Sequence, residues 1–188
     1  TLRSSSAASD VYKRQGVGGY CLTKDPLLAS WSKQNINGAG YSGLPMSETA
    51  VSTNDKMPMY AFNFLESFYG DSFLKGKKVQ ILGVSYLSGV GDTRYSPVEI
   101  FYKNLIKNKC DVYLHDPYVS YWEELDLEVS QELGNFHGID IVIFTTGHSE
   151  YSDNKELIKN LCQLDNVIVY DTIGILNDKE IDMLSTTN

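Results

Sequence analysis

Val79-Gln-Ile-Leu-Gly-Val-Ser-Tyr86 is the stretch from which the expected architecture follows. Its apolar residues and the glycine-containing loop after it predict a buried β-strand. Further strands are predicted over residues 111–116, 140–145 and 166–171, and helices over residues 97–107, 121–134, 154–164 and 178–184. This alternation predicts the α/β class, with a doubly wound parallel sheet of about four strands that is covered on both faces.

A ligand is expected at the loops that follow the predicted strands, because ligands of open parallel sheets bind beyond the carboxyl ends of the strands. Asp116 and Asp171 end two of these strands and more simply form turns than act as catalytic carboxylates. His148 lies just beyond a third strand. We interpret it as a loop histidine whose hydrogen bonds are satisfied within the protein, with contact to a ligand as the alternative.

Two helices are expected before the sheet. The first covers residues 25–33 and is expected to start at Asp25-Pro26, an N-cap followed by proline in the first turn. The second covers residues 47–69, where aromatic and apolar residues recur at spacings of three and four. Pro58 is expected to kink or interrupt this helix and Gly70 to end it. Its aromatic residues indicate a core or a subunit contact.

The chain is expected to have three parts. Residues 1–15 are small, polar and aperiodic, as is typical of a disordered lead-in or a foreign junction sequence. Residues 16–75 hold a glycine run, a cysteine and the central helical segment. Residues 76–188 are predicted to form a Rossmann-like domain.

The composition narrows the class of protein. The 188 residues are 42% hydrophobic and 21% charged, as is typical of a globular protein. The net charge of -8 argues against a nucleic-acid partner and against an anionic membrane surface. No apolar run approaches the roughly 20 residues of a transmembrane helix, and the opening residues show no signal-peptide pattern. Dispersed cysteines and histidines indicate neither disulfides nor a metal site, so we expect a cytoplasmic protein without a bound metal.

Gly16-Val-Gly-Gly-Tyr-Cys21-Leu-Thr-Lys24-Asp25-Pro26 places a cysteine between a glycine run and a predicted helix. Glycines let the backbone approach a ligand closely. The lysine and the positive end of the helix would favour the thiolate form of Cys21, which is the nucleophilic form. Two interpretations stand: Cys21 is a nucleophile beside a ligand, or it is a small hydrophobic residue in a turn.

Leu87-Ser-Gly-Val-Gly-Asp-Thr-Arg94-Tyr-Ser-Pro97 follows the first predicted strand. Its glycines lack the G-x-G-x-x-G spacing, so this half of the chain is expected to have no dinucleotide signature of its own. Arg94 is a strong candidate to bind an anion. The alternative is an exposed arginine in a salt bridge, for which Asp92 is a plausible partner.

The cysteine stretch 16–26 resembles the catalytic cysteine loop of the UDP-glucose/GDP-mannose dehydrogenase family. Ile81-Leu-Gly-Val-Ser-Tyr86 and Gly91-Asp-Thr-Arg94-Tyr-Ser-Pro97 together resemble the opening of the family's C-terminal nucleotide-sugar-binding domain. Asp116-Pro117 and Asp171-Thr172 fall where that domain has similar strand ends. The pairing of the two loops makes the resemblance specific.

The resemblance implies that the primary alcohol of a nucleotide sugar is oxidised to a carboxylate, with two NAD. Cys21 matches the nucleophile that traps the aldehyde as a thiohemiacetal. A second hydride transfer converts this adduct to a thioester, which water cleaves. Asp25 matches an aspartate that assists water or proton handling. Lys24 and Arg94 match positions that approach NAD, where arginine suits a pyrophosphate.

The resemblance also implies which residues hold the substrate, for which a UDP-sugar is expected. The backbone of the glycine run cradles the sugar, and the loop after the first strand faces the nucleotide. The residues carried over as substrate-binding are Gly16, Val17, Gly18, Gly19, Tyr20, Tyr86 and Leu87. A homodimer through the 47–69 helix is the expected assembly.

The chain departs from the family pattern in three ways. The N-terminal Rossmann domain, with its G-x-G-x-x-G and acid/base residues, is expected to lie outside this chain, and Arg14-Gln15 stands where the family has Pro-Gly. Leu87 and Ile173 stand where the family has lysine and arginine. Each charged hydrogen bond is worth roughly 1.5–3 kcal/mol. Losing two would weaken a UDP site by about two to four decades.

These observations lead to a ranked set of hypotheses. The first is the central and C-terminal part of an NAD-dependent nucleotide-sugar 6-dehydrogenase, inactive without its N-terminal domain. The second is a non-catalytic module that binds a nucleotide sugar or mediates dimerisation. A cysteine-based redox or acyl-transfer protein ranks last, because no histidine base is evident near Cys21.

Overall fold

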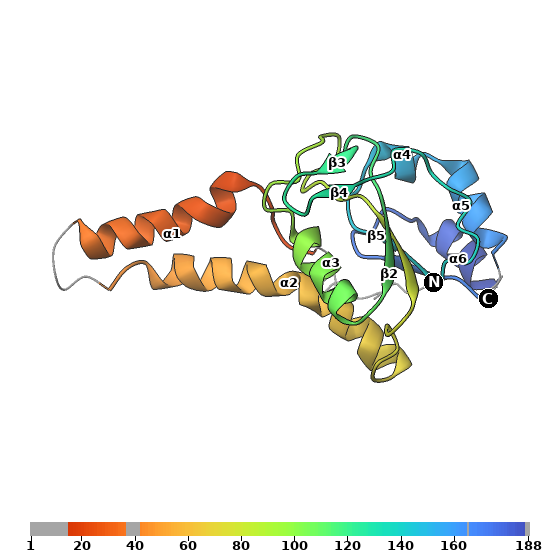
Figure 1. The fold of residues 1–188 in the computed structure, drawn as a ribbon, viewed down its shortest axis with the longest axis horizontal. Coiled ribbons are helices and arrows are strands. Elements are labelled where there is room, and N and C mark those ends of the chain that lie inside the picture. The colour runs from red at the N-terminus through yellow and green to blue at the C-terminus, as the bar shows by residue number, and fades with distance from the viewer. Residues whose placement is uncertain (1–14, 37–41, 165, 187–188) are drawn as a thin grey trace.

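The computed structural model describes residues 15–36, 42–164 and 166–186. Apart from Gln15, the lead-in expected over residues 1–15 therefore lies outside the described residues. The chain forms a sheet flanked by helices, from which a pair of long helices projects (Figure 1).

Four parallel strands form the main sheet, and they confirm the predicted α/β class. They are β1 (Lys78–Leu82), β2 (Asp111–His115), β5 (Ile141–Phe144) and β6 (Ile168–Asp171), in the spatial order β2-β1-β5-β6. β2 lies on one side of β1, and β5 and β6 lie on the other, so the topological switch point is between β1 and β5. β1 ends earlier than predicted, because Gly83 turns the chain with a φ of 98°.

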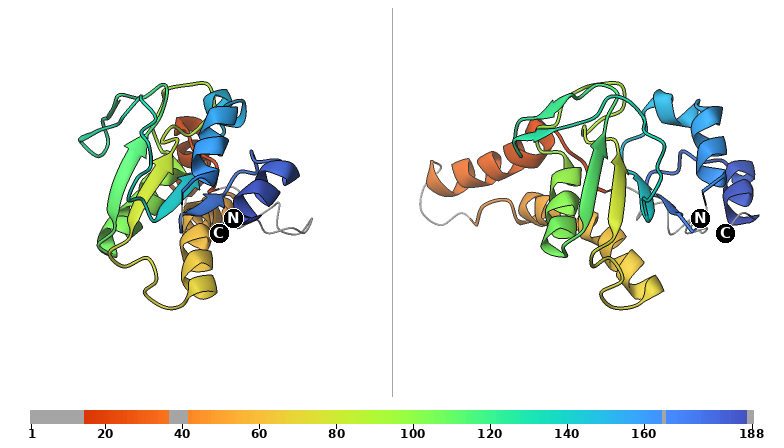
Figure 2. Two further views of the ribbon diagram at one scale, coloured as in Figure 1. Left: turned by 90° about the vertical axis from the view of Figure 1, so that its right-hand side faces the viewer. Right: turned by 45° about the vertical axis from the view of Figure 1, so that its right-hand side comes forward.

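Helices lie on both faces of the sheet (Figure 2). Alternate side chains of the strands join a separate buried cluster on each face. The flanking helices are α2 (Pro45–Tyr69), α3 (Pro97–Lys107), α5 (Lys155–Cys162) and α6 (Asp178–Thr186). Val79 and Ile81 belong to a buried cluster with α2 and α3, whereas Leu82 and Val142 belong to a second cluster with α5 and α6. Successive side chains of each strand therefore pack into two different cores, one on each face of the sheet.

Residues 121–134 do not form the predicted helix, so that prediction is wrong. They contain a small antiparallel hairpin of β3 (Tyr121–Trp122) and β4 (Leu127–Glu128). The helix-like spacing of apolar residues comes from the hairpin turn, in which the Leu125 N–H donates to the Trp122 carbonyl oxygen (3.2 Å). Asp126 completes this turn with a φ of 56°. Trp122 is fully buried in the core that α2 and α3 share.

The two projecting helices are α1 (Tyr20–Asn35) and α2. α1 begins earlier than predicted, because Gly19 turns the chain into the helix with a φ of 88°. Asp25-Pro26 therefore lies inside α1, and the predicted N-cap role of Asp25 is wrong. Pro58 does not interrupt α2, although the helix changes direction along its length in Figure 1. Gly70 ends α2 with a φ of 109°, as predicted.

A one-turn helix, α4 (Ser149–Ser152), follows β5. Among the helices of the described ranges, none is both long enough and apolar enough to span a membrane.

Candidate functional site

A solvent-open cavity of about 590 Å³ lies at the carboxyl ends of the strands, next to the switch point between β1 and β5. It is lined by residues 15–18 and Leu22, by residues 85–88, by Pro97 and Val98, by residues 145–147, and by Ile173 and Ile175. The cavity therefore brings the glycine run together with the loops that follow β1, β5 and β6. This is the edge of the sheet at which the sequence predicts a ligand.

The glycine run packs directly against the loop after β1. A Cβ atom at Gly18 would lie 2.5 Å from Tyr86 Cβ and 2.7 Å from the Tyr95 carbonyl oxygen, so no side chain fits there. The rings of Tyr20 and Tyr95 meet edge to face, with centroids 5.2 Å apart. The two loops that carry the family resemblance are thus in contact, although they are far apart in the sequence.

Asn54 of α2 holds the glycine run from the other side. Its Oδ1 accepts a hydrogen bond from the Val17 N–H (2.7 Å), and its Nδ2 donates to the Val17 carbonyl oxygen (2.8 Å). A Cβ atom at Gly16 would lie 3.1 Å from Asn54 Oδ1, so this contact also favours glycine. Nothing in the sequence indicated this role of Asn54, because an asparagine within a helix gives no signal of a partner 37 positions away.

Asp116, just after β2, fixes the start of the loop after β1. Its Oδ2 accepts hydrogen bonds from the N–H groups of Val84 (2.8 Å) and Ser85 (3.0 Å), and its Oδ1 accepts one from the Tyr118 N–H (2.9 Å). Burial raises the pKa of Asp116, but hydrogen bonds from His148 and from these N–H groups outweigh burial and lower the pKa below its ordinary value. The prediction that Asp116 forms a strand-end turn is confirmed.

Asp171, at the end of β6, fixes the turn that follows this strand. Its Oδ1 accepts hydrogen bonds from the N–H groups of Ile173 (3.1 Å) and Gly174 (2.7 Å), and its Oδ2 accepts one from Leu176 (3.0 Å). The carboxylate is therefore engaged within its own turn, as predicted. This turn presents Ile173 and Ile175 to the cavity.

His148 is fully buried behind the cavity wall and satisfies its ring nitrogens within the protein, as predicted. Its Nδ1 accepts a hydrogen bond from the Gly89 N–H (3.0 Å). Its Nε2 lies 3.0 Å from Ser85 Oγ and 3.1 Å from Asp116 Oδ2. The three side chains do not form a catalytic triad, because serine and aspartate contact the same ring nitrogen, whereas in a triad they contact opposite nitrogens.

The cavity wall is uncharged among the lining residues that the structure describes. The hydroxyl groups of Ser85, Thr145 and Thr146 donate to backbone carbonyl oxygens, so their protons are already engaged. The side-chain amide of Gln15 also lines the cavity, and it is buried without a hydrogen-bond partner. We assign Gln15 no role, because it belongs to the segment expected to be a lead-in.

The structure divides the predicted site residues into two groups. Gly16, Val17, Gly18, Tyr86 and Leu87 line the cavity. Gly19, Tyr20, Cys21, Lys24, Asp25 and Arg94 are not among the lining residues. Leu22, which no sequence motif indicated, also lines the cavity, because it lies in the first turn of α1.

Of the predicted catalytic and cofactor-binding residues, Cys21, Asp25 and Arg94 are exposed, and Lys24 is half-buried. Cys21 lies in the first turn of α1 and faces solvent. Lys24 pairs with Asp25 (2.9 Å) and lies over the Tyr20 ring, 4.7 Å from its centroid. Arg94 pairs with Asp92 (2.6 Å), the partner that the sequence suggested. This pairing lowers the pKa of Asp92 and raises that of Arg94.

One G-x-G-x-x-G spacing does occur, as Gly38-Ala-Gly-Tyr-Ser-Gly43. A dinucleotide fingerprint requires a strand before the glycines and a helix after them. Here the stretch connects α1 to α2, so helices lie on both sides. The spacing therefore does not indicate a dinucleotide site.

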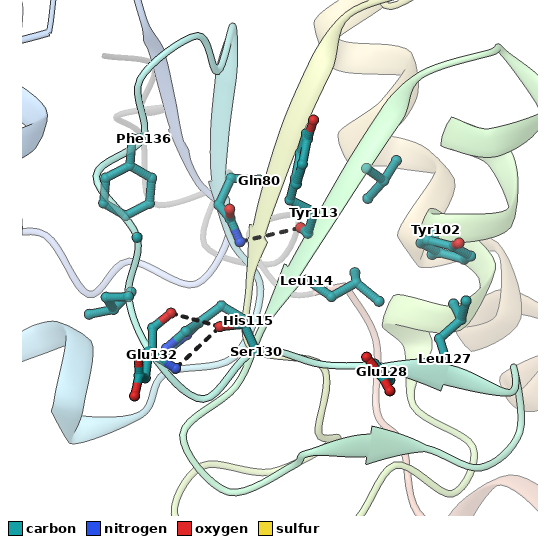
Figure 3. A pocket seen from close by; sticks show the side chains of 13 residues that line it. Gln80, Tyr102, Tyr113, Leu114, His115, Leu127, Glu128, Ser130, Glu132 and Phe136 are labelled. Carbon is teal, nitrogen blue, oxygen red and sulfur yellow. Dashed lines mark hydrogen bonds between the residues drawn. The ribbon is translucent and has the colours of Figure 1, made fainter.

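A second cavity, of about 410 Å³, lies along the outer edge of β2 (Figure 3). Its walls come from Gln80 of β1, from β2, from Tyr102 of α3 and from the segment 127–136. It shares no residue with the first cavity and contains none of the predicted site residues. We therefore take the first cavity as the candidate site. No three His, Cys, Asp or Glu side chains of the described part of the chain are placed to hold a metal ion.

Comparisons with known proteins point in one direction. The sequence model described as "UDP-glucose/GDP-mannose dehydrogenase family, UDP binding domain" matches residues 80–178. A UDP-N-acetyl-D-mannosamine dehydrogenase of Methanococcus aeolicus is 30% identical over 164 residues, which make up 86% of this chain and 35% of that protein. A UDP-glucose 6-dehydrogenase of Rickettsia bellii is 28% identical over 177 residues, 90% of this chain and 39% of that protein. The chain thus spans little more than a third of the length of these relatives.

Solved structures agree with the sequence relatives. An NDP-N-acetyl-D-galactosaminuronic acid dehydrogenase from Methanosarcina mazei matches with a TM-score of 0.72 and 27% identity, covering 91% of this chain and 37% of that chain. A GDP-mannose dehydrogenase from Pseudomonas aeruginosa matches with a TM-score of 0.67 over 86% of this chain and 37% of that one. At 19% identity, the second likeness shows the fold alone.

Proposed function

The chain belongs to the UDP-glucose/GDP-mannose dehydrogenase family, and we propose that it is the C-terminal, nucleotide-sugar-binding part of an NAD-dependent nucleotide-sugar 6-dehydrogenase. The observation that carries the proposal is the cavity at the switch point, where the glycine run meets the loop after β1. The names of the relatives, which include UDP-N-acetyl-D-mannosamine dehydrogenases, support a UDP-sugar as the substrate.

In this proposal, the cavity holds the nucleotide sugar through backbone and apolar contacts. The glycine run, held by Asn54, offers a close backbone surface to the sugar. Tyr86 and Leu87, next to the glycine run, form the wall that faces the nucleotide, and Ile173 and Ile175 add apolar surface. Because the described lining carries no cation, the diphosphate charge is left without a side-chain partner on this wall, and affinity of this chain for UDP is weak.

Cys21 is the proposed nucleophile. Its thiol adds across the aldehyde: the sulfur bonds to C6 as the C=O π bond opens, and the proton lost by the thiol ends on the oxygen, which gives a thiohemiacetal. Its position in the first turn of α1, exposed to solvent, leaves the sulfur accessible. NAD, when bound to the complete enzyme, would supply hydride-acceptor chemistry. The described residues do not fit a site for NAD, because Lys24 and Arg94 are each paired with a neighbouring carboxylate. We therefore assign no residue of this chain a role in binding NAD.

The test is calorimetry of the chain with UDP, comparing the wild type with Leu87→Lys. Lysine at this position of the cavity wall adds a cation beside the diphosphate. We expect UDP affinity to rise about tenfold, as one charged hydrogen bond predicts. Val90→Lys is the matched control, because it adds the same charge to the same loop at a residue that does not line the cavity. Its affinity should stay close to that of the wild type.

Two results would contradict the proposal. If neither the wild type nor Leu87→Lys binds UDP saturably, the proposed nucleotide site does not exist. Equal gains from Leu87→Lys and Val90→Lys would show that the added charge attracts UDP without regard to the cavity.

A further inference from the structure

The loop after β1 forms one wall of the candidate cavity, yet its residues 83–88 contain neither helix nor strand. Its near end is held by Asp116 through the N–H groups of Val84 and Ser85. The Thr146 hydroxyl also donates to the Ser85 carbonyl oxygen (2.7 Å). The loop is also closed by the hydrogen bond from the Tyr86 N–H to the Asp92 carbonyl oxygen (3.0 Å). Within this closed loop, next to Leu87 and Ser88, Gly89 makes one further contact.

That contact is the hydrogen bond between Gly89 and His148. The N–H of Gly89 lies 3.0 Å from Nδ1 of His148. A backbone N–H only donates, so Nδ1 must carry a lone pair and no proton. Since a neutral imidazole protonates one nitrogen, the proton lies on Nε2.

The surroundings of Nε2 agree with this tautomer. Asp116 Oδ2, 3.1 Å away, only accepts while it is ionised, so Nε2–H donates toward it. The Ser85 hydroxyl gives its proton to the Leu87 carbonyl oxygen (3.1 Å), and its oxygen is free to accept from Nε2–H at 3.0 Å. Each donor and acceptor around the buried ring is therefore matched only when His148 is neutral and protonated at Nε2.

We propose that His148, as its neutral Nε2–H tautomer, is a positioning residue that ties Gly89 to the sheet edge and thereby places Leu87 and Ser88 in the wall of the ligand cavity. His148 does not line the cavity, so its effect on a ligand passes through the loop. The part of this inference that concerns ligand binding rests on the proposed function. The tautomer of His148 and the tether, by which we mean the hydrogen bond from the Gly89 N–H to His148 Nδ1, do not depend on that function.

Two variants separate the functions of the two ring nitrogens. His148→Asn places a side-chain oxygen near the position of Nδ1 and keeps an acceptor for Gly89. His148→Gln places a side-chain amide near the position of Nε2 and keeps a donor for Asp116, but it offers Gly89 no acceptor. Both variants remove the same ring from the same buried position, so a general loss of packing affects them alike.

The readouts are hydrogen exchange of the Gly89 amide and calorimetric affinity for UDP. We expect Gly89 exchange to rise roughly tenfold in His148→Gln, as loss of one hydrogen bond predicts, and to rise far less in His148→Asn. UDP affinity should fall about fivefold in His148→Gln and stay within about twofold of the wild type in His148→Asn. Gly89 exchange that is equal in the two variants would overturn the tether. Raised exchange with unchanged UDP affinity would overturn the positioning role.

Nitrogen NMR of the wild-type ring tests the tautomer without any variant, so it remains decisive if the variants do not fold. We expect the proton on Nε2 and none on Nδ1. A proton on Nδ1 would overturn the inference. If neither the wild type nor Leu87→Lys binds UDP, the proposed function fails, while the ring spectrum and Gly89 exchange still decide whether the hydrogen bond between Gly89 and His148 exists.

Discussion

Asp116 joins three parts of the molecule through a single buried carboxylate. It accepts hydrogen bonds from the loop after β1, from its own turn and from His148. Its pKa is lowered because these donors favour the ionised form more than burial disfavours it. A carboxylate of this kind stabilises the fold and holds the cavity loop in one place.

The first prediction concerns the Asp116→Asn variant. At neutral pH we expect it to lose about 2–4 kcal/mol of unfolding free energy, because the amide cannot accept from all of the buried donors. The lowered pKa also sets a pH dependence. Asp116 contributes stability above its ordinary pKa of 3.8, and this contribution is lost as pH falls through the lower pKa of the folded protein. Denaturant titrations across acidic pH should show this loss in the wild type and a smaller loss in the variant.

Asp92→Asn is the matched control for that prediction. The pKa of Asp92 is also lowered, by Arg94, but this pair lies at the surface. Exposed ion pairs contribute little to stability, so the control should stay close to the wild type. An Asp116→Asn variant as stable as the control would contradict the buried network.

The elements meet at the cavity through one close backbone approach. The glycine run enters α1, the loop after β1 enters α3, and Gly18 is the point at which the two segments touch. The run therefore has a local structural purpose in addition to its proposed contact with the sugar. Any side chain at Gly18 must push the two segments apart.

Gly18→Ala should accordingly destabilise the protein by about 1–3 kcal/mol, the usual cost of overpacking, and weaken UDP binding. The added Cβ would meet Tyr86 at 2.5 Å and the backbone of Tyr95 at 2.7 Å. Gly134→Ala is the control, because a Cβ there has no atom within 4 Å. Chemical denaturation and calorimetry measure both effects. Equal stability of the two variants would show that the glycine run and the loop after β1 are not in contact in solution.

The whole molecule consists of a packed sheet domain and a projecting pair of helices (Figure 1). Large apolar side chains are exposed on both projecting helices, among them Leu22, Leu27, Leu28, Trp31, Met46, Phe68 and Tyr69. Apolar surface of this extent is typical of an interaction site. We propose that α2 pairs two copies of the chain, and that residues 76–188 bind the ligand together with the glycine run that opens residues 16–75.

Self-association is therefore expected in sedimentation experiments at increasing protein concentration. Phe68→Glu should shift the equilibrium toward monomer, because it places a charge among the apolar residues of α2. Ile106→Glu is the control, since Ile106 is also exposed but lies on α3. A wild type that sediments as a monomer at all concentrations would refute the proposed dimer.

Local patterns in the sequence were enough to predict the sheet, its flanking helices and the turns of Asp116 and Asp171. Burial of one face makes apolar residues recur at the period of a strand or a helix, and Gly70 ends α2 because glycine adopts a positive φ. Both features depend only on residues that are near one another in the sequence. The same patterns misplaced the start of α1 and mistook the hairpin around Trp122 for a helix. Apolar residues that recur every three positions are found in tight turns as well as in helices. Tertiary packing decides which of the two structures forms.

The cavity itself depends on contacts between residues that are distant in the sequence. Asn54 meets Val17, His148 meets Gly89, and Gly18 meets Tyr86, and none of these pairs shares a local pattern. The sequence identified the chemically notable residues Cys21 and Arg94 and suggested Asp92 as the partner of Arg94, but folding alone set the exposure of Cys21 and kept both residues out of the cavity lining. Periodicity encodes which faces are buried, whereas hydrogen bonds across the sheet edge form only when separate loops converge there.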